Sequence, residues 1–170
     1  MTEIEVKIRI DDPEKVSAKL AALGAELIKE RHREKNTLYD FASRSLFHRK
    51  SALRLRTANK KAYLTFKGPP QKSRKFKIRE EYETEVKNAK QMKKILKELG
   101  LIPTFQYEKY RTIYRQKKCK ICLDETAIGF YLELEGEQSH IVRVAASLGF
   151  SKKEFIKLDY IRLIKNKNTS

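Results

Sequence analysis

Acidic residues form ExE pairs at three places in the chain, each within an alternation of polar and apolar residues. The pairs are Glu3 and Glu5, Glu83 and Glu85, and Glu133 and Glu135. In a β-strand, residues two apart point to the same face, so each pair presents two carboxylates side by side. Mg²⁺ and Mn²⁺ prefer oxygen ligands and usually take a few carboxylates together with phosphate oxygens. The pairs therefore predict a divalent-metal site built from several strands.

Basic residues also alternate with apolar ones in segments that read as strands, both in the first ExE strand and in strands between the ExE pairs. They are Lys7, Arg54, Arg56, Lys67, Lys109 and Arg111. Arginine offers bidentate donors to phosphate oxygens, and lysine acts as a compact point charge. If the sheet curls so that these faces look inward, the like charges share a low-dielectric space, which is costly unless opposite charges neutralise them. A polyphosphate bridged by a metal would do so, and we take this as the leading interpretation.

Reaction at such a phosphate needs mainly positioning and charge neutralisation, so a Ser, Cys or His nucleophile is not required. The three histidines show no ligand or triad spacing. Cys119 and Cys122 form a CxxC, but their segment reads as a strand, in which residues three apart point to opposite faces. We interpret both cysteines as strand side chains and not as a zinc or redox pair.

Three other interpretations of the charged faces stay open. Antiparallel sheets often keep one face in water, and alternating charges then serve solubility. The net charge of +17 and the tyrosines at 107, 110 and 114 also fit a nucleic-acid-binding module. Such a module gives no reason for acidic pairs, which repel phosphate unless a cation intervenes. A polyphosphate sensor without catalysis is consistent with the same pattern.

Length and composition limit the class of protein. The chain has 170 residues, which corresponds to one domain of ordinary size, and its balance of 40% hydrophobic and 36% charged residues is that of a folded protein. No apolar run approaches the roughly 20 residues of a membrane span. Patterned sequence begins at Glu3 without a secretory signal, so a cytoplasmic location without disulfides is expected. The positive charge indicates an anionic ligand.

Apolar periodicity predicts the elements that carry the charged residues. Residues 3–10 alternate strictly, and Asp12 with Pro13 begins a helix that Gly24 ends. The same unit, an ExE strand followed by a helix that ends in Leu-Gly, occurs twice more, with Gly100 and Gly149 as the final glycines. This recurrence indicates an imperfect internal repeat.

The remaining segments are a basic loop and a C-terminal helix. Residues 71–77 read as a basic loop. Ser151 and Glu154 match a capping box, which predicts one last short helix running toward Leu163. A polar tail at residues 166–170 follows.

The charged strands occur in an order that resembles a known family. EIEVK at 3–7 is similar to the ExExK opening of the CYTH superfamily, also called triphosphate tunnel metalloenzymes, which includes class IV adenylate cyclases and thiamine and inorganic triphosphatases. Six further segments resemble the later strands of the family and occur in the same order. They are ALRLR, YLTFKGP, REEYETEV, YEKYR, LDE and YLELEGE. The likeness covers about residues 3 to 163 and implies a single CYTH-like domain at 1–165.

The resemblance implies an α+β fold, an antiparallel eight-stranded closed β-barrel, or tunnel, with helices packed outside. It implies metal binding by Glu3, Glu5, Glu133 and Glu135. It implies triphosphate binding by Lys7, Arg54, Arg56, Lys67, Arg79, Lys109 and Arg111. Lys7 and Asp124 are the residues it implies for catalysis, and Glu81, Glu83 and Glu85 would line the same tunnel.

The activity implied is that of a Mg²⁺- or Mn²⁺-dependent enzyme acting on a nucleoside triphosphate or another triphosphate. The strings LTFKGP and YLELEGE look most like class IV adenylate cyclases, which convert ATP to cyclic AMP and pyrophosphate. The alternative is an inorganic or organic triphosphatase that hydrolyses tripolyphosphate or thiamine triphosphate. No membrane partner is expected, nucleic acid is disfavoured, and a homodimer is left open.

Overall fold

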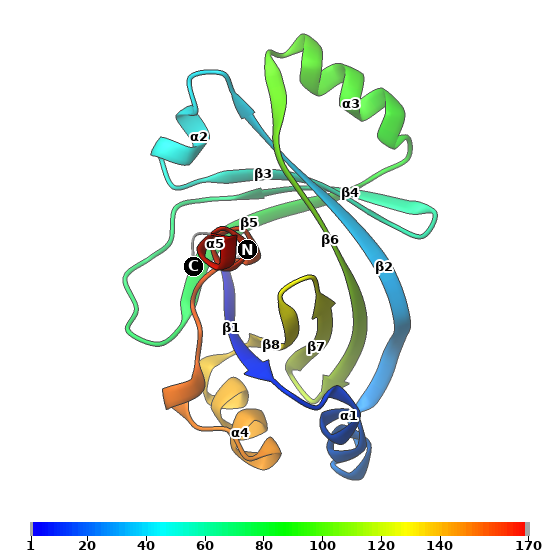
Figure 1. Cartoon of the computed structure of the whole chain (residues 1–170), viewed down its shortest axis with the longest axis vertical. Coiled ribbons are helices and arrows are strands. Elements are labelled where there is room, and N and C mark those ends of the chain that lie inside the picture. The colour runs from blue at the N-terminus through cyan, green and yellow to red at the C-terminus, as the bar shows by residue number, and fades with distance from the viewer. Residues whose placement is uncertain (1, 169–170) are drawn as a thin grey trace. The chain divides into compact units, whose positions relative to one another are not determined.

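The computed structural model describes residues 2–168 and contains eight strands and five α-helices (Figure 1). In chain order the elements are β1 (Thr2–Ile10), α1 (Pro13–Ala22), β2 (Glu26–Phe41), α2 (Ser45–His48), β3 (Ala52–Ala58), β4 (Lys61–Lys67), β5 (Lys77–Val86), α3 (Ala89–Glu98), β6 (Leu101–Gln116), β7 (Cys119–Thr126), β8 (Gly129–Gly136), α4 (Gln138–Leu148), the 3₁₀ turn η1 (Lys152–Glu154) and α5 (Tyr160–Asn168).

The strands form a closed barrel in the order β1-β5-β4-β3-β2-β6-β7-β8. Neighbours along the chain, such as β3 with β4 and β7 with β8, pair antiparallel, and β1 pairs antiparallel with β8. Helices pack around the barrel. The predicted α+β fold with a closed eight-stranded antiparallel barrel is therefore confirmed.

The contacts divide the chain into two compact units, which we describe separately. The first unit contains residues 33–71 and 79–108 together with Thr2. The second contains residues 3–32, 72–78 and 109–168 of the described chain. The single domain at 1–165 stays a prediction. Helix α5 extends through Asn168 into the segment predicted as a polar tail, and Thr169 and Ser170 lie outside the described residues.

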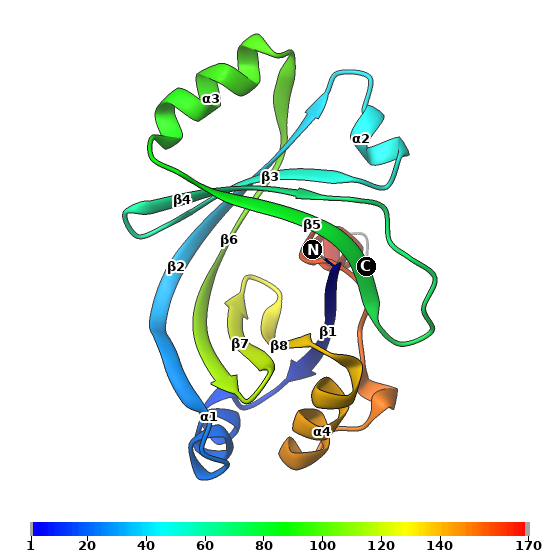
Figure 2. The same cartoon turned by 180° about the vertical axis from the view of Figure 1, so that it is seen from behind.

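The second unit has an apolar core that its strands form with α1 and α4. These two helices lie near each other in Figure 2. The strand residues of this core include Val6, Ile8, Ile121, Leu132 and Leu134, and the helix residues include Val16, Leu20, Ile141 and Leu148. On β1 the buried Val6 and Ile8 alternate with charged residues, as the sequence predicts. One face of the strands is therefore fixed against α1 and α4, and the charged side chains project from the other face.

The first unit has a smaller apolar core. It consists of Tyr39, Leu46, Leu55, Leu96 and Leu101, with Leu53, Leu64, Phe66 and Met92 packed against it. Leu46 comes from α2 and Leu96 from α3, so both helices cover the same face of β3. Arg54 and Arg56 alternate with Leu53 and Leu55 on β3 and point to the opposite face.

The predicted helix boundaries of the internal repeat are confirmed. The side chain of Asp12 accepts a hydrogen bond from the amide of Lys15 at the start of α1, and Asn88 does the same for Gln91 in α3. Gly100 has φ of 83° and Gly149 has φ of 93°, a conformation that favours glycine at a helix end. A strand, a helix and a terminal Leu-Gly thus recur three times.

The predicted C-terminal helix is wrong in one respect. The capping box of Ser151 and Glu154 forms, but it caps only the 3₁₀ turn η1. Residue 156 then pairs with β1, where the amide of Ile156 donates to the carbonyl of Lys7 at 2.8 Å and the reverse bond measures 3.0 Å. Because these backbone bonds hold Ile156 in an extended segment, the helix restarts only at Tyr160.

Candidate functional site

Charged side chains gather on the face of β1, β6, β7 and β8 that lies opposite the core of the second unit. The register places Lys7 across from Glu133 and Glu5 across from Glu135, and it places Arg111 across from Asp124. Cross-strand partners point to the same face, so the sheet itself brings these groups together. We call Glu5, Lys7, Lys109, Arg111, Asp124 and Glu133 the buried charge cluster. Each of them is at most 7% exposed.

Lys7 lies between two carboxylates of the buried charge cluster. Its Nζ is 3.1 Å from Glu5 Oε1 and 3.1 Å from Glu133 Oε2. Burial by itself lowers the pKa of an ammonium group, but the charges of Glu133 and Glu5 outweigh it and raise the pKa of Lys7. Lys77, the first residue of β5, adds a contact of 2.8 Å to the same oxygen of Glu5. Lys7 therefore keeps its positive charge in a buried position.

Asp124 accepts hydrogen bonds from several side chains of the cluster. Arg111 donates to its two oxygens from Nε and Nη2, both at 2.6 Å, and Lys109 donates to Oδ2 at 3.0 Å. Arg111 also reaches Glu133 at 2.9 Å. Burial raises the pKa of a carboxyl group, but Arg111 and Lys109 outweigh it and hold the pKa of Asp124 below its usual value. Asp124 is thus a fixed anion that aligns two cations.

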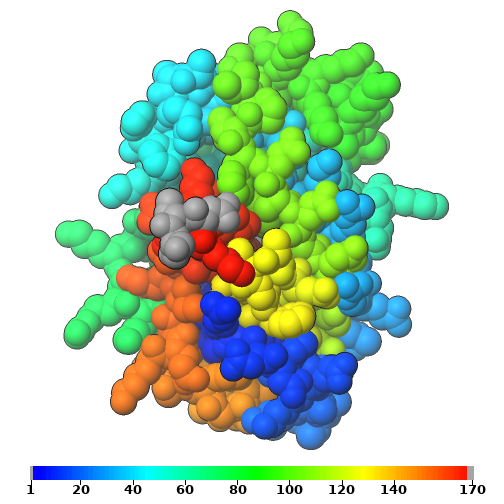
Figure 3. Space-filling view, viewed as in Figure 1, coloured from blue at the N-terminus to red at the C-terminus, as the bar shows by residue number. Residues whose placement is uncertain are grey.

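Tyr160 enters the buried charge cluster from α5, a contact that the sequence analysis missed. Its hydroxyl donates to Asp124 Oδ2 at 2.6 Å, and its ring centroid is 5.0 Å from Lys7 Nζ and 4.7 Å from Lys109 Nζ. The space-filling view shows α5 at the surface beside the β7–β8 hairpin (Figure 3). Burial and the neighbouring carboxylates, Asp124 first, raise the pKa of Tyr160.

The other acidic residues assigned to metal lie at the edge of this cluster. Glu135 is paired with Lys120 at 2.8 Å, and its side chain is 31% exposed. Glu3 is half-buried and lies two residues before Glu5 on β1, so the two side chains are on the same face of the strand. Cys122 lies across from Glu133, whereas Cys119 belongs to the apolar core, so the two cysteines occupy opposite faces as predicted. Burial raises the pKa of each thiol to about 12, which makes both unreactive.

Within residues 2–168, no group of three or more His, Cys, Asp or Glu side chains is placed to hold a metal ion by itself. Lysines and arginines neutralise the carboxylates instead. The donors still fit a divalent cation that arrives with a phosphate, because Mg²⁺ is usually held by one or two carboxylates plus phosphate oxygens. Glu5 and Glu135 are direct cross-strand partners and offer such a pair of hard oxygen ligands.

The first unit carries its own network of arginines and carboxylates. Arg56 donates from Nη1 to Glu34 and from Nη2 to Glu83, each at 3.0 Å. Arg54 Nη2 is 3.6 Å from Glu83, and the hydroxyl of Thr65 donates to Glu83 at 2.6 Å. We call Glu34, Arg54, Arg56, Thr65 and Glu83 the arginine network. Its two positive and two negative charges balance.

The remaining predicted residues of the first unit form separate contacts. Lys67 is 2.6 Å from Glu81, and Lys61 is 3.2 Å from the exposed Glu85. The guanidinium of Arg79 donates to the backbone carbonyls of Gly68, at 2.6 Å, and of Lys50. These two bonds tie the ends of β3 and β4 together, and a substrate role for Arg79 stays a prediction.

Three residues of these clusters could not be predicted from the sequence: Glu34, Lys77 and Tyr160. Glu34 lies on β2, where charged residues occupy both parities, as in ERHREK at 30–35, so no apolar alternation marks the strand. Lys77 ends the segment predicted as a loop. For Tyr160 the only signal in the sequence is an aromatic residue directly before Ile161 and Leu163 at the start of a short helix.

The CYTH domain model matches residues 1–157. A protein of Methanocaldococcus jannaschii that carries the name "putative adenylate cyclase" is 30% identical over 174 aligned positions, covering 96% of this chain and 98% of that protein. Among solved structures, an adenylate cyclase-like protein of Vibrio parahaemolyticus has a TM-score of 0.88 at 18% identity and covers 97% of this chain and 98% of its own.

A second solved structure comes from Hippeastrum, with a TM-score of 0.71 at 23% identity over 97% of this chain and 96% of that chain. It is described as an adenylyl cyclase candidate, HpAC1, with a dominant triphosphatase activity. Since the domain model spans most of the sequence, the chain belongs to the CYTH family. No helix within residues 2–168 is long and apolar enough to cross a membrane.

Proposed function

We propose that this chain is a Mg²⁺- or Mn²⁺-dependent enzyme that acts on a triphosphate. The observation that carries the proposal is the buried charge cluster, in which Lys7, Lys109 and Arg111 form ion pairs with Glu5, Asp124 and Glu133. Burying so many charges is expensive for a fold and rarely adds stability, so such a cluster favours a functional role. Membership of the CYTH family points to the same chemistry.

Each type of residue has a distinct proposed task. Lys7, Lys109 and Arg111 would neutralise and orient phosphoryl oxygens, because their positions are fixed by Glu133 and Asp124 before a ligand arrives. Arg54, Arg56, Lys67 and Arg79 are the further residues proposed for triphosphate binding. Glu3, Glu5, Glu133 and Glu135 would hold the cation, which supplies charge neutralisation at the phosphate. Asp124 would act through Arg111 and Lys109 as their anchor.

Within this class we favour conversion of ATP to cyclic AMP and pyrophosphate. The Methanocaldococcus relative, at 30% identity, carries an adenylate cyclase name. In that reaction the ribose 3′-hydroxyl attacks the α-phosphorus and pyrophosphate leaves. The alternative is a triphosphatase, in which water attacks the terminal phosphorus of an organic or inorganic triphosphate, and the activity described for the Hippeastrum protein is a reason to test it.

The test is to incubate the purified chain with ATP or tripolyphosphate in the presence of Mn²⁺, Mg²⁺ or EDTA and to resolve the products. Cyclic AMP with pyrophosphate supports the cyclase, and orthophosphate without a cyclic nucleotide supports the triphosphatase. Lys109→Met should abolish either activity, whereas Lys118→Met, at a site 73% exposed, should not. Equal turnover in EDTA, or no turnover of either compound, would reject the proposal.

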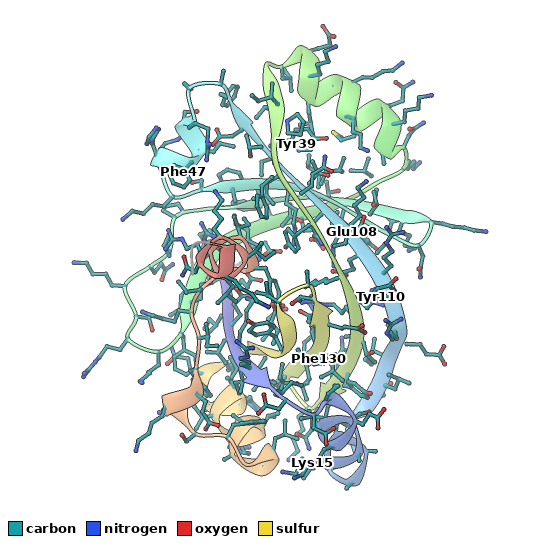
Figure 4. The ribbon with its side chains drawn as sticks, viewed as in Figure 1. Lys15, Tyr39, Phe47, Glu108, Tyr110 and Phe130 are labelled. Atoms are coloured by element: carbon teal, nitrogen blue, oxygen red, sulfur yellow. The ribbon has the colours of Figure 1, made fainter. Side chains whose placement is uncertain are left out.

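A nucleic-acid-binding role is less well supported. Of the tyrosines that suggested it, Tyr110 is labelled in Figure 4. It has the guanidinium of Arg31 over its ring at 3.8 Å, and the hydroxyl of Tyr114 is 2.8 Å from Ser17 Oγ. Rings that bind bases must offer a free face. The Arg31 guanidinium already covers one face of the Tyr110 ring, so that face is not open to a base.

A further inference from the structure

Asn36 is a fully buried amide without a hydrogen-bond partner. Its side chain is 0% exposed, and neither Nδ2 nor Oδ1 has a partner among the described residues. Leaving a buried polar group unsatisfied costs free energy, so native proteins rarely keep one without a reason. Nothing in the packing of the first unit requires an amide here, because its apolar core lies on the other face of β2 and β3.

The register places Asn36 beside the arginine network. Asn36 is the direct cross-strand partner of Arg56, and Leu38, two residues on, is the partner of Arg54. Directly opposed residues of an antiparallel pair leave the sheet on the same face with adjacent Cβ atoms. The amide of Asn36 therefore shares a face with both guanidinium groups.

The two arginines have unused donors as well. Arg54 Nε and Arg56 Nε are buried and have no hydrogen-bond partner within residues 2–168. Together with Asn36 Nδ2, three N–H groups from neighbouring positions of β2 and β3 lack acceptors. Several N–H donors without acceptors, next to positive charge, complement an oxyanion such as a phosphoryl group.

The two carboxylates of the arginine network differ in how easily they can be displaced. Glu34 is 1% exposed and holds Arg56 from the interior, whereas the Glu83 side chain is 31% exposed and contacts both arginines. A phosphoryl group that takes the place of Glu83 would draw Arg54 and Arg56 toward itself. Arg56 lies directly across from Asn36. Movement of its side chain toward the phosphoryl group would therefore expose the Asn36 amide to that group.

We propose that Asn36 is a further substrate-binding residue, whose Nδ2 donates a hydrogen bond to the phosphoryl group held by Arg54 and Arg56 after that group displaces Glu83. This inference rests on the proposed triphosphate function. The free protein carries the cost of an unsatisfied amide, and the ligand removes it. Asn36 Oδ1 is then able to accept a hydrogen bond from a water or hydroxyl bound with the ligand.

The test is Asn36→Leu, which keeps the shape of the side chain and removes its polar atoms. Calorimetry measures binding of the diimido analogue of ATP and of inorganic diimidotriphosphate, whose P–N–P bridges resist cleavage, with Mg²⁺ present. Affinity should fall about 10- to 100-fold for both ligands, the loss expected for a hydrogen bond to a charged group. The melting temperature without ligand should stay equal or rise by about 2–4 °C, because the unsatisfied amide is gone.

The matched control is Thr37→Val, the next residue of β2, which points to the other face opposite Leu55 and should leave both affinities unchanged. A lower melting temperature in Asn36→Leu, or unchanged affinity, overturns the inference and indicates a structural amide. A loss confined to the ATP analogue also overturns it, since Asn36 would then contact the organic group. If the unmodified protein binds neither ligand, the proposed function itself fails and the inference falls with it.

Discussion

Asp124 shows how a single carboxylate can hold a charged site together. Asp124 accepts bonds from Arg111, Lys109 and Tyr160, so its negative charge is spread over three donors that come from β6 and α5. Removing any donor leaves the others in place, but removing the carboxylate would leave buried cations without compensation. We therefore expect the fold to tolerate substitution of one donor better than substitution of Asp124.

Tyr160→Phe should lower the free energy of unfolding by ~1–2 kcal/mol at pH 7, since one buried hydrogen bond is lost. Because the pKa of Tyr160 is raised in the folded protein, the stabilisation is complete below about pH 10, where the unfolded tyrosine is still protonated. Above pH 10 the unfolded chain loses this proton before the folded one does, so the advantage of the tyrosine shrinks. Urea unfolding of both proteins from pH 7 to 11 measures this, and a constant difference would contradict it.

Glu135→Gln should raise the metal concentration needed for half-maximal activity, with little change in folding. Glu135 is a proposed ligand that pairs across the strands with Lys120, whose side chain is 41% exposed, so removing the Glu135 charge leaves a lysine that can still reach water. Glu125→Gln is the control, because Glu125 on β7 forms an exposed pair with Arg31 on β2. A metal titration of initial rates should shift about tenfold or more in the first variant. Equal curves would remove Glu135 from the metal site.

At the scale of elements, the turn from β2 to α2 depends on one aspartate. Asp40 is 4% exposed and accepts hydrogen bonds from the amides of Phe41, Leu46 and Phe47 at 2.8 to 3.0 Å. These bonds outweigh burial and lower the pKa of Asp40. The carboxylate thus replaces a conventional cap for α2, whose own N-cap, Arg44, makes no side-chain cap bond.

Asp40→Ala should lower the free energy of unfolding by ~2–3 kcal/mol at pH 7, because buried amides lose a charged acceptor. Since the folded pKa lies below the unfolded value of about 3.9, the stabilisation is present above that pH and is lost as the pH falls through the folded pKa. Chemical denaturation at pH 7 and near pH 3 measures both effects. The exposed Asp11→Ala serves as the control and should change stability by less than about 0.5 kcal/mol.

The same elements show why part of the site could be predicted and part could not. Strands such as β1 alternate apolar and charged residues, so the sequence identifies the faces of Lys7 and Glu5. In β2 both parities are charged, and the pairing with β3 that brings Glu34 and Asn36 to Arg56 is a long-range contact without a local signal. The break before Tyr160 depends on the pairing of Ile156 with Lys7, which no local pattern encodes.

At the scale of the whole molecule, the net charge of +17 should affect how fast an anionic substrate arrives. Attraction between the protein and a triphosphate raises the association rate and is screened as the Debye length falls from about 10 Å at 0.1 M salt to about 3 Å at 1 M. We expect kcat/KM to fall at least several-fold between 0.05 and 0.5 M KCl, while kcat changes much less. Steady-state kinetics at constant pH and metal concentration test this. A flat kcat/KM would show that long-range attraction plays no part.

Closure of the strand order has a consequence for handling the protein at high concentration. Each of the eight described strands has a hydrogen-bonded neighbour on both sides, so none of them is an edge strand along its whole length to which another copy could readily add a strand. Templated growth into amyloid would first require one of its strands to detach. Agitated, concentrated samples should therefore stay negative for thioflavin T until conditions that open the barrel are reached.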